Sequence, residues 1–202
     1  MSLLYFRSMS RRGAKRLRQI GNWLALALVV GSVGSAAFVY LRWRFREQRY
    51  NKLIEAVAGQ YGVDKFLVKA VIRRESEFDP FVYGRAGEIG LMQVTEGAGR
   101  EWARATGRKN FGRDSLWDER VNIEAGTWYL ARALNRWRDK DDPVPFALAE
   151  YNAGFGNVLR WLPNGQATTA AQFQEAITFP GVRRYVDTVT ELCAGYQTEG
   201  AP

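Results

Sequence analysis

The sequence predicts an all-α fold in which one compact helical domain follows a single N-terminal transmembrane helix. Residues 21–41 form an uncharged and almost wholly apolar run, whereas residues 51–192 read as successive helical segments joined by short turns. No segment shows a convincing alternating strand pattern or an internal repeat. A chain of 202 residues with 47% hydrophobic content has room for one core and an appendage.

The apolar run is long enough to span a bilayer as one helix, because no charged side chain occurs between Gln19 and Leu41. Six basic residues precede the run and four follow it, which favours a cytoplasmic N-terminus and an exported domain. The predicted divisions are a basic cytoplasmic tail at 1–20, a transmembrane anchor at 21–41, a juxtamembrane linker at 42–50, a folded domain at 51–192 and a C-terminal tail at 193–202.

Two other interpretations of the apolar run are a cleaved signal peptide and a buried helix of a soluble protein. Small residues at 35–37 provide a cleavage site, but the apolar stretch continues through Phe38 to Leu41, which favours a retained anchor. The strongly basic flanks disfavour a buried helix. Both the anchor and the signal peptide export the domain.

The charge distribution argues against nucleic-acid binding. The net charge is +8, but residues 1–50 hold ten lysines and arginines against Glu47 alone, so the remainder is close to neutral. The chain has no histidine, which excludes Ser-His-Asp and Cys-His catalysis and the usual zinc ligand sets. Cys193 is the only cysteine, so no intramolecular disulfide forms, and a small apolar residue on a late helix is expected there. We expect neither a metal nor a cofactor.

The first helix that bears on function begins after Asp64, a good N-cap, and carries Leu67 and Val71 toward the core before it reaches Glu75. Proline residues open a later helix at 143–145, and Gly107 and Gly154 are expected to end helices. The remaining predicted helices run over about 91–106, 119–138, 143–153, 158–162 and 182–192, the fourth stopping at the Pro-Asn-Gly of 163–165.

Glu75 stands out because its carboxyl group falls on an apolar stripe. It lies four residues after Val71 and eight after Leu67, so a helix places it on the face that otherwise meets the core. Burial and the negative end of the helix dipole both raise the pKa of a carboxyl group, as a general acid requires. The competing interpretation is a glutamate at a frayed helix end, paired with Arg73 or Arg74.

Four segments resemble the lytic transglycosylase domain of the family that includes the soluble lytic transglycosylases and is related in fold to goose-type lysozyme. They are ESEFDP at 75–80, GEIGLMQV at 87–94, NIEAGTWYL at 122–130 and ALAEYNAG at 147–154. They occur in the family's order, and the resemblance covers about residues 51–190. It implies a compact lysozyme-like helical domain that cuts the glycan strands of bacterial peptidoglycan.

The resemblance also implies residue roles. Glu75 occupies the position of the single catalytic acid and base, and Tyr151 and Asn152 would face it across the cleft, with the Tyr151 hydroxyl orienting the carboxyl. The other implied substrate-binding residues are Ser76, Gly90, Leu91, Met92, Gln93 and Tyr185. The 90–93 segment would form one wall, with the Gln93 amide on the sugar and Met92 as an apolar floor. Alternatively, Met92 and Tyr151 are core residues, and Gln93 and Asn152 are turn or cap residues.

Three departures from the family pattern affect the site. Glu88 stands where a small residue is common, and Glu150 stands where alanine is frequent; we expect both to face solvent rather than to tune Glu75. The segment FPGVRRYV at 179–186 lacks the Glu-Thr-Arg that often precedes the family's late helix, so Tyr185 is a weaker assignment than Tyr151. Four tryptophans are candidates for either sugar stacking or the core: Trp102, Trp117, Trp128 and Trp161.

The resemblance implies cleavage of the β-1,4 bond between N-acetylmuramic acid and N-acetylglucosamine, with 1,6-anhydro ends and no cofactor. The alternatives are a muramidase that admits water and a non-catalytic peptidoglycan-binding module. The expected partners are the glycan strands, the membrane through the N-terminal helix, and a cell-wall or secretion complex. The expected location is the bacterial inner membrane, single-pass, with the catalytic domain in the periplasm or extracytoplasmic space.

Overall fold

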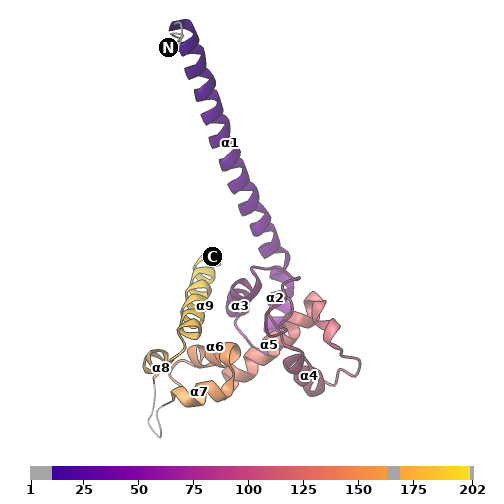
Figure 1. The fold of residues 1–202 in the computed structure, drawn as a ribbon. Coiled ribbons are helices and arrows are strands. Elements are labelled where there is room, and N and C mark those ends of the chain that lie inside the picture. Colours follow the sequence, from indigo (N-terminus) through magenta and orange to yellow (C-terminus); the bar gives the residue numbers. More distant parts are fainter. Residues whose placement is uncertain (1–10, 163–168, 201–202) are drawn as a thin grey trace, which may run out of the picture. The chain divides into compact units, whose positions relative to one another are not determined.

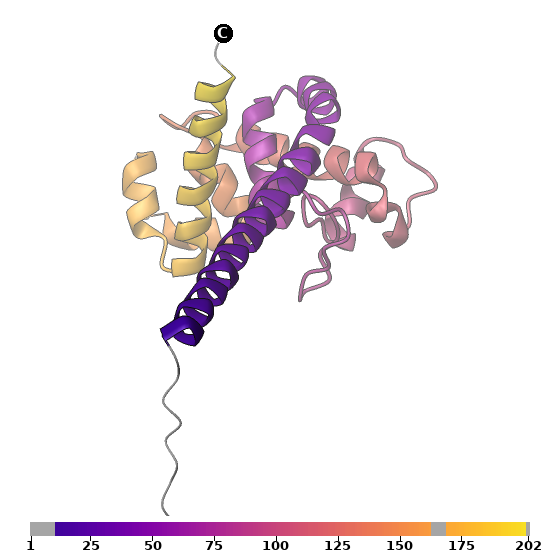
Figure 2. The ribbon, with the colours of Figure 1, turned by 90° about the horizontal axis from the view of Figure 1, so that it is seen from above.

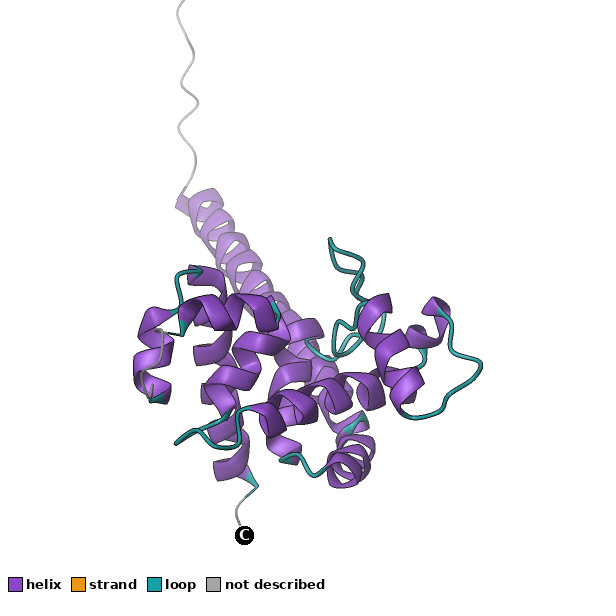
Figure 3. Cartoon of the chain, turned by 90° about the horizontal axis from the view of Figure 1, so that it is seen from below, coloured by secondary structure: helices purple, strands orange, loops and turns teal. Residues whose placement is uncertain are grey.

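The computed structural model describes residues 11–162 and 169–200 and confirms the all-α class. No strand occurs in these two ranges, where the β-type pairing consists of isolated antiparallel bridges joining Tyr83 to Ile89 and Ile89 to Val94 (Figure 3). The chain divides into two compact units, Met1–Phe45 and Arg46–Pro202. Each unit is described by itself below.

The first unit contains most of helix α1 (Arg11–Arg49) (Figure 1). The range Gly21–Tyr61 holds a helical stretch that is long and apolar enough to cross a membrane, and no residue of its apolar window is buried. Trp23, Leu28 and Phe38 are among its large exposed hydrophobic residues. Within the predicted juxtamembrane linker at 42–50, residues 42–49 are helical, because no proline or glycine interrupts them.

The second unit is a bundle of helices around one core. Its elements are α2 (Asn51–Tyr61), α3 (Lys65–Ser76), α4 (Glu96–Ala105), η1 (Arg113–Trp117), α5 (Glu119–Arg136), α6 (Val144–Ala153), α7 (Phe155–Trp161), α8 (Ala170–Ala176) and α9 (Pro180–Glu199). Helix α3 packs against α9 and α2, and α6 packs against α5 and α9. Figure 2 shows α8 and α9 on one side of this unit and the loop between α4 and η1 on the other.

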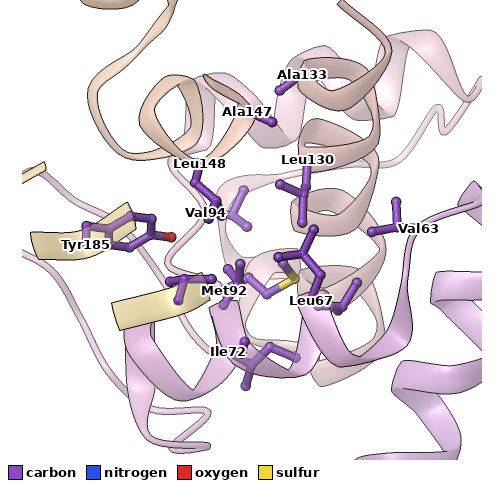
Figure 4. Packing of buried hydrophobic residues seen from close by; sticks show 14 of the residues in the cluster. Val63, Leu67, Ile72, Met92, Val94, Leu130, Ala133, Ala147, Leu148 and Tyr185 are labelled. Atoms are coloured by element: carbon purple, nitrogen blue, oxygen red, sulfur yellow. The ribbon is translucent and has the colours of Figure 1, made fainter. Parts of the chain in front are cut away.

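Helix α3 forms where the sequence predicts it. The Asp64 side chain caps the helix by accepting a hydrogen bond of 2.8 Å from the backbone N–H of Phe66. Leu67 and Val71 are buried on its inner face. Figure 4 shows Leu67 and Ile72 of α3 near Met92, which comes from the loop before α4, with Leu130 of α5 on the far side of Leu67 from Ile72. The core therefore holds both the end of α3 and this loop.

Several predicted boundaries were wrong. Helix α4 begins at Glu96 rather than near Leu91, because Gln93 adopts a positive φ of 48° and Thr95 caps the helix. The last helix reaches Glu199 and buries Tyr196, so most of the predicted tail at 193–202 is helical. The helices α2 and α8 and the short η1 were not assigned individually. The predicted stop at 163–165 lies outside the described residues, as do residues 1–10 of the basic tail.

Candidate active site

The carboxyl group of Glu75 lies at the end of α3, where the helix stops abruptly. Glu77 is the C-cap with a φ of 50°, and Phe78 follows with a φ of 61°, so the chain turns away through left-handed conformations. Glu75 is half-buried, and its Oε1 accepts a hydrogen bond of 2.7 Å from the hydroxyl of Tyr185 on α9. Contact between α3 and α9 thus brings together residues that are far apart in sequence.

The surroundings of Glu75 favour its protonated form. Burial raises the pKa of Glu75 to about 7; the hydrogen bond from Tyr185 and the charge of Arg74 oppose this shift, and the negative charge of Glu88 adds to it. The pKa values of Tyr185 and Tyr151 are raised well above the ordinary value, first by burial and next by the charge of Glu75. Both tyrosines are therefore neutral hydroxyl groups at physiological pH. A carboxyl group with a pKa near 7 can both give and take a proton.

A cleft opens beside Glu75. Its lining residues are Glu75, Gly84, Arg85, Glu88, Gln93, Thr95, Tyr151 and Asn152. A second hollow shares three of these residues, Gln93, Thr95 and Tyr151. It is also lined by Val94, Ala98, Gly126, Tyr129, Glu150 and Gly154. Because they share three lining residues, the two hollows adjoin each other, and the two together are called the groove.

The wall of this groove at residues 90–93 is held by Asn122 of α5. The Asn122 amide nitrogen donates to the carbonyl oxygens of Ile89 at 2.7 Å and Leu116 at 2.9 Å, while its oxygen accepts a 2.8 Å bond from the N–H of Met92. Gly90 has a φ of 74°, and a Cβ atom there would lie 2.6 Å from the Asn122 amide nitrogen. Glycine is therefore required at this position for both its conformation and its size.

Two hydroxyl groups fix the same wall from α3 and α6. The Ser76 hydroxyl donates to the carbonyl oxygen of Leu91 at 2.8 Å, and the Tyr151 hydroxyl donates to that of Met92 at 2.7 Å. A Cβ atom on Gly126 would lie 2.6 Å from the Met92 sulfur, so this glycine makes room for the Met92 side chain. The wall is thus tied to the helix that carries Glu75 and to the two helices that face it.

Of the nine predicted site residues, Gly90 lies in the wall, Tyr185 contacts Glu75, and the other seven divide into two groups. Glu75, Gln93, Tyr151 and Asn152 line the cleft together. Leu91 and Met92 are fully buried and Ser76 is nearly so, which places these three side chains in the support of the wall. We expected Met92 to form an apolar floor of the site, but its side chain is buried beneath the wall. The Gln93 amide nitrogen donates to the carbonyl oxygens of Val82 and Gly90, at 3.1 and 2.9 Å, and so also stabilises the wall.

Tyr151 was expected to contact and orient the Glu75 carboxyl group, but another tyrosine makes this contact. The hydroxyl that contacts the Glu75 carboxyl is that of Tyr185, whereas the Tyr151 hydroxyl bonds to the Met92 carbonyl. The sequence alone did not point to the supporting role of Asn122, although the residue lies in one of the matching segments. The signal that could have revealed it is a polar amide in the first turn of α5, on the face that carries the buried residues of this amphipathic helix.

The two unusual glutamates lie elsewhere than expected. Glu150 is buried rather than exposed: its Oε2 accepts a bond of 2.8 Å from the Trp137 indole, and its Oε1 lies 3.3 Å from the Arg136 Nε. Glu88 is half-buried and lines the cleft, and its Oε2 accepts a 2.9 Å bond from the N–H of Ala86. Glu88, unlike Glu150, therefore adds a carboxylate to the cleft that holds Glu75.

The four tryptophans that were candidates for sugar stacking or the core differ in burial. Trp102 and Trp161 are buried in the core, and Trp117 and Trp128 pack against it with part of each ring exposed. Tyr83 covers the Trp117 ring in a stacked arrangement, with ring centroids 6.4 Å apart. Core packing is therefore the observed role of at least two of the four residues.

The chain is similar in sequence to known proteins. The family model described as "Transglycosylase SLT domain" matches residues 52–174. The membrane-bound lytic murein transglycosylase F of Desulfosudis oleivorans is 40% identical over 116 residues, which are 56% of this chain and 24% of that protein. The membrane-bound lytic murein transglycosylase C of Shigella sonnei is 34% identical over 131 residues, which are 62% of this chain and 36% of that protein. The chain therefore spans little more than a third, at most, of the length of these relatives.

A solved structure gives the same result for the fold. The 70 kDa soluble lytic transglycosylase of Escherichia coli aligns with a TM-score of 0.68 at 30% identity, covering 74% of this chain and 24% of that one. This match confirms the predicted lysozyme-like helical domain.

Proposed function

The chain belongs to the transglycosylase SLT family, and on this premise we propose that it is a peptidoglycan lytic transglycosylase with Glu75 as its acid and base. The observation that carries the proposal is the environment of Glu75. Its half-buried carboxyl group is held by the Tyr185 hydroxyl at the edge of a groove, and its pKa is raised to about 7. A pure binding module has no need of such a group.

The first step of the proposed reaction breaks the glycosidic bond. Protonated Glu75 gives its proton to the oxygen that links N-acetylmuramic acid to N-acetylglucosamine, and the leaving sugar departs with a new hydroxyl group. The acetamido oxygen of the substrate stabilises the positive C1 that remains. Tyr185 holds the carboxyl group in place and stabilises the carboxylate that forms, because its hydroxyl is a neutral donor.

The second step closes the ring without water. The Glu75 carboxylate takes the proton of the muramic C6 hydroxyl while the oxygen of that hydroxyl bonds to C1, which gives a 1,6-anhydro end and restores the acid. The proton balance is zero over the cycle, and the two products together have the mass of the substrate. We propose that Gln93 and Asn152 contact the sugars, because both line the cleft with Glu75.

One observation favours the muramidase as a second candidate. Glu88 lines the same cleft as Glu75, and an inverting hydrolase needs a second carboxylate to activate water. The two reactions differ only in whether water or the C6 hydroxyl attacks C1. Their products therefore differ by the mass of one water molecule.

The product test separates these functions. The purified full chain in detergent is incubated with peptidoglycan sacculi, and the released fragments are analysed by mass spectrometry, with Glu75→Gln as the control. We expect 1,6-anhydromuramic ends that are absent with the control variant. Reducing ends would identify a muramidase. Sedimentation with the sacculi but no released fragments would support the non-catalytic module.

We further propose membrane association through residues 21–41, with the catalytic domain at 51–192 on the outer side of the bacterial inner membrane. The apolar helix and the larger number of basic residues before it than after it support this arrangement, as do two relatives whose names describe them as membrane-bound. Protease added to spheroplasts should degrade the domain, and protection there would contradict it. A mature N-terminus near Phe38 would indicate a cleaved signal peptide. Recruitment to a cell-wall or secretion complex stays a prediction.

A further inference from the structure

The folded unit begins at Arg46, and its first residues are fixed to the loop after α3 and to the start of α5. The Arg46 guanidinium lies 3.2 Å from Oδ2 of Asp79. Three residues later, Arg49 pairs with Glu119 at 3.0 Å, and the hydroxyl of the buried Tyr50 donates to the same carboxylate at 2.8 Å. The chain therefore enters the folded unit at a defined point beside Asp79.

This attachment point lies a short distance along the chain from the apolar run. Only residues 42–45 separate Leu41, the last residue of the uncharged stretch, from Arg46. Even a fully extended chain reaches at most about 18 Å over these five steps, and a helix about 7.5 Å. A domain of this size is roughly 40 Å across. If residues 21–41 span the membrane, the attachment point at Arg46 and Asp79 lies within about 18 Å of the membrane surface.

A large apolar side chain stands out beside this attachment point. Phe81 is 78% exposed, the highest value among the large hydrophobic residues that the structure describes in the folded unit. Its backbone N–H donates a 3.0 Å bond to Oδ1 of Asp79, whose other oxygen pairs with Arg46. The turn that attaches the domain to the chain thus also holds Phe81 outward. Burial of such a side chain is favourable, and phenylalanine is among the residues that interfacial segments bury at the boundary between headgroups and acyl chains.

We propose that Phe81 inserts into the interface between lipid headgroups and acyl chains, and that the loop at 79–83 docks the folded unit on the membrane. The inference rests on the proposed membrane span and adds a second membrane contact to it. The loop continues directly into Gly84, Arg85 and Glu88, which line the cleft. Docking would therefore hold the cleft at glycan strands next to the membrane rather than at the distant layers of the wall.

The experiment measures the depth of this side chain in proteoliposomes of the full chain. With Cys193→Ser as the background, Phe81→Cys is labelled with a fluorophore, and lipids that carry a nitroxide on the acyl chain are used as quenchers. Leu159→Cys is the matched control, because Leu159 is 49% exposed on α7. Figure 1 places α7 at the end of the folded unit away from the start of α2. We expect at least threefold stronger quenching at position 81 than at position 159.

Equal quenching at the two positions, in vesicles that carry the protein to the top of a density gradient, would overturn the docking and leave the anchor intact. Failure of the chain to float with the vesicles would overturn the anchor and with it this inference. Neither result depends on glycan cleavage, so the proposed enzymatic activity is tested separately. Because position 81 is exposed, the label should leave the circular dichroism spectrum unchanged.

Discussion

The hydroxyl of Tyr185 donates a hydrogen bond of 2.7 Å to Oε1 of Glu75, and this contact joins α9 to the end of α3. The bond has two effects on the carboxyl group. It fixes the orientation of Glu75, and it stabilises the ionised form against the larger effect of burial, which raises the pKa to about 7. A donor that is itself neutral can hold the carboxyl group in both protonation states of the proposed cycle.

The first prediction follows from this bond. Tyr185→Phe should lower kcat on the order of tenfold to a thousandfold, because it removes one orienting hydrogen bond and leaves the acid in place. Removal of the bond should also raise the pKa of Glu75, so the alkaline limb of the kcat/KM profile should move to higher pH. Tyr151→Phe is the matched control: its hydroxyl bonds to the Met92 carbonyl, so it should reduce activity while the limb stays in place. Equal movement in both variants would refute the assignment.

The second prediction concerns Glu88, which lines the same cleft and whose charge raises the pKa of Glu75. Glu88→Gln keeps the size of the side chain and removes the charge, so the pKa of Glu75 should fall and the alkaline limb should move to lower pH. The shift is opposite in direction to that of Tyr185→Phe. The ends of the released fragments are identified in the same reaction mixtures by mass spectrometry. A change from reducing ends to anhydro ends would show that Glu88 activates water in the native enzyme.

The third prediction is that Glu75→Gln abolishes cleavage and stabilises the fold above neutral pH. The folded-state pKa of Glu75 is raised, so its contribution to stability is fully present below its ordinary pKa of 4.5 and is lost as the pH rises through about 7. The neutral amide avoids this loss and should raise the free energy of unfolding on the order of 1–3 kcal/mol at pH 8, with little effect at pH 4. Thermal unfolding of both proteins at the two pH values measures the difference. Glu191→Gln, at an exposed position on α9, should change neither value by more than about 0.5 kcal/mol.

Local signals explain which parts of the fold could be predicted. Asp64 is a capping residue, and the apolar spacing from Leu67 to Val71 defines the inner face of α3, so the place of Glu75 on that face follows from its neighbours in sequence. Gly154 ends α6 with a φ of 83°, as its position in the sequence predicts. These features depend on contacts within one or two turns of a helix.

The remaining features depend on contacts between distant segments. Nothing in the sequence around Tyr185 shows that its hydroxyl reaches Glu75, because that bond requires the packing of α9 on α3. The apolar residues Leu91 and Met92 resemble a helix start, but the Asn122 side chain holds this region as a loop through two hydrogen bonds, one with the Ile89 carbonyl and one with the Met92 N–H. Glu150 was expected to face solvent, and only its tertiary partners Trp137 and Arg136 allow its burial.

The last prediction tests whether Asn122 holds the groove wall. Asn122→Ala would leave the buried N–H of Met92 and the carbonyl oxygens of Ile89 and Leu116 without this partner. Because an unsatisfied buried polar group costs about 1–3 kcal/mol, the free energy of unfolding should fall on the order of 3 kcal/mol or more. Urea unfolding followed by tryptophan fluorescence measures this loss.

The matched control is Asn152→Ala, at an exposed position in the cleft. It should change stability by less than about 0.5 kcal/mol, and it should weaken glycan binding if its amide contacts the sugar. A stable Asn122→Ala protein with full activity would show that the bonds from Ser76 and Tyr151 suffice to hold the wall.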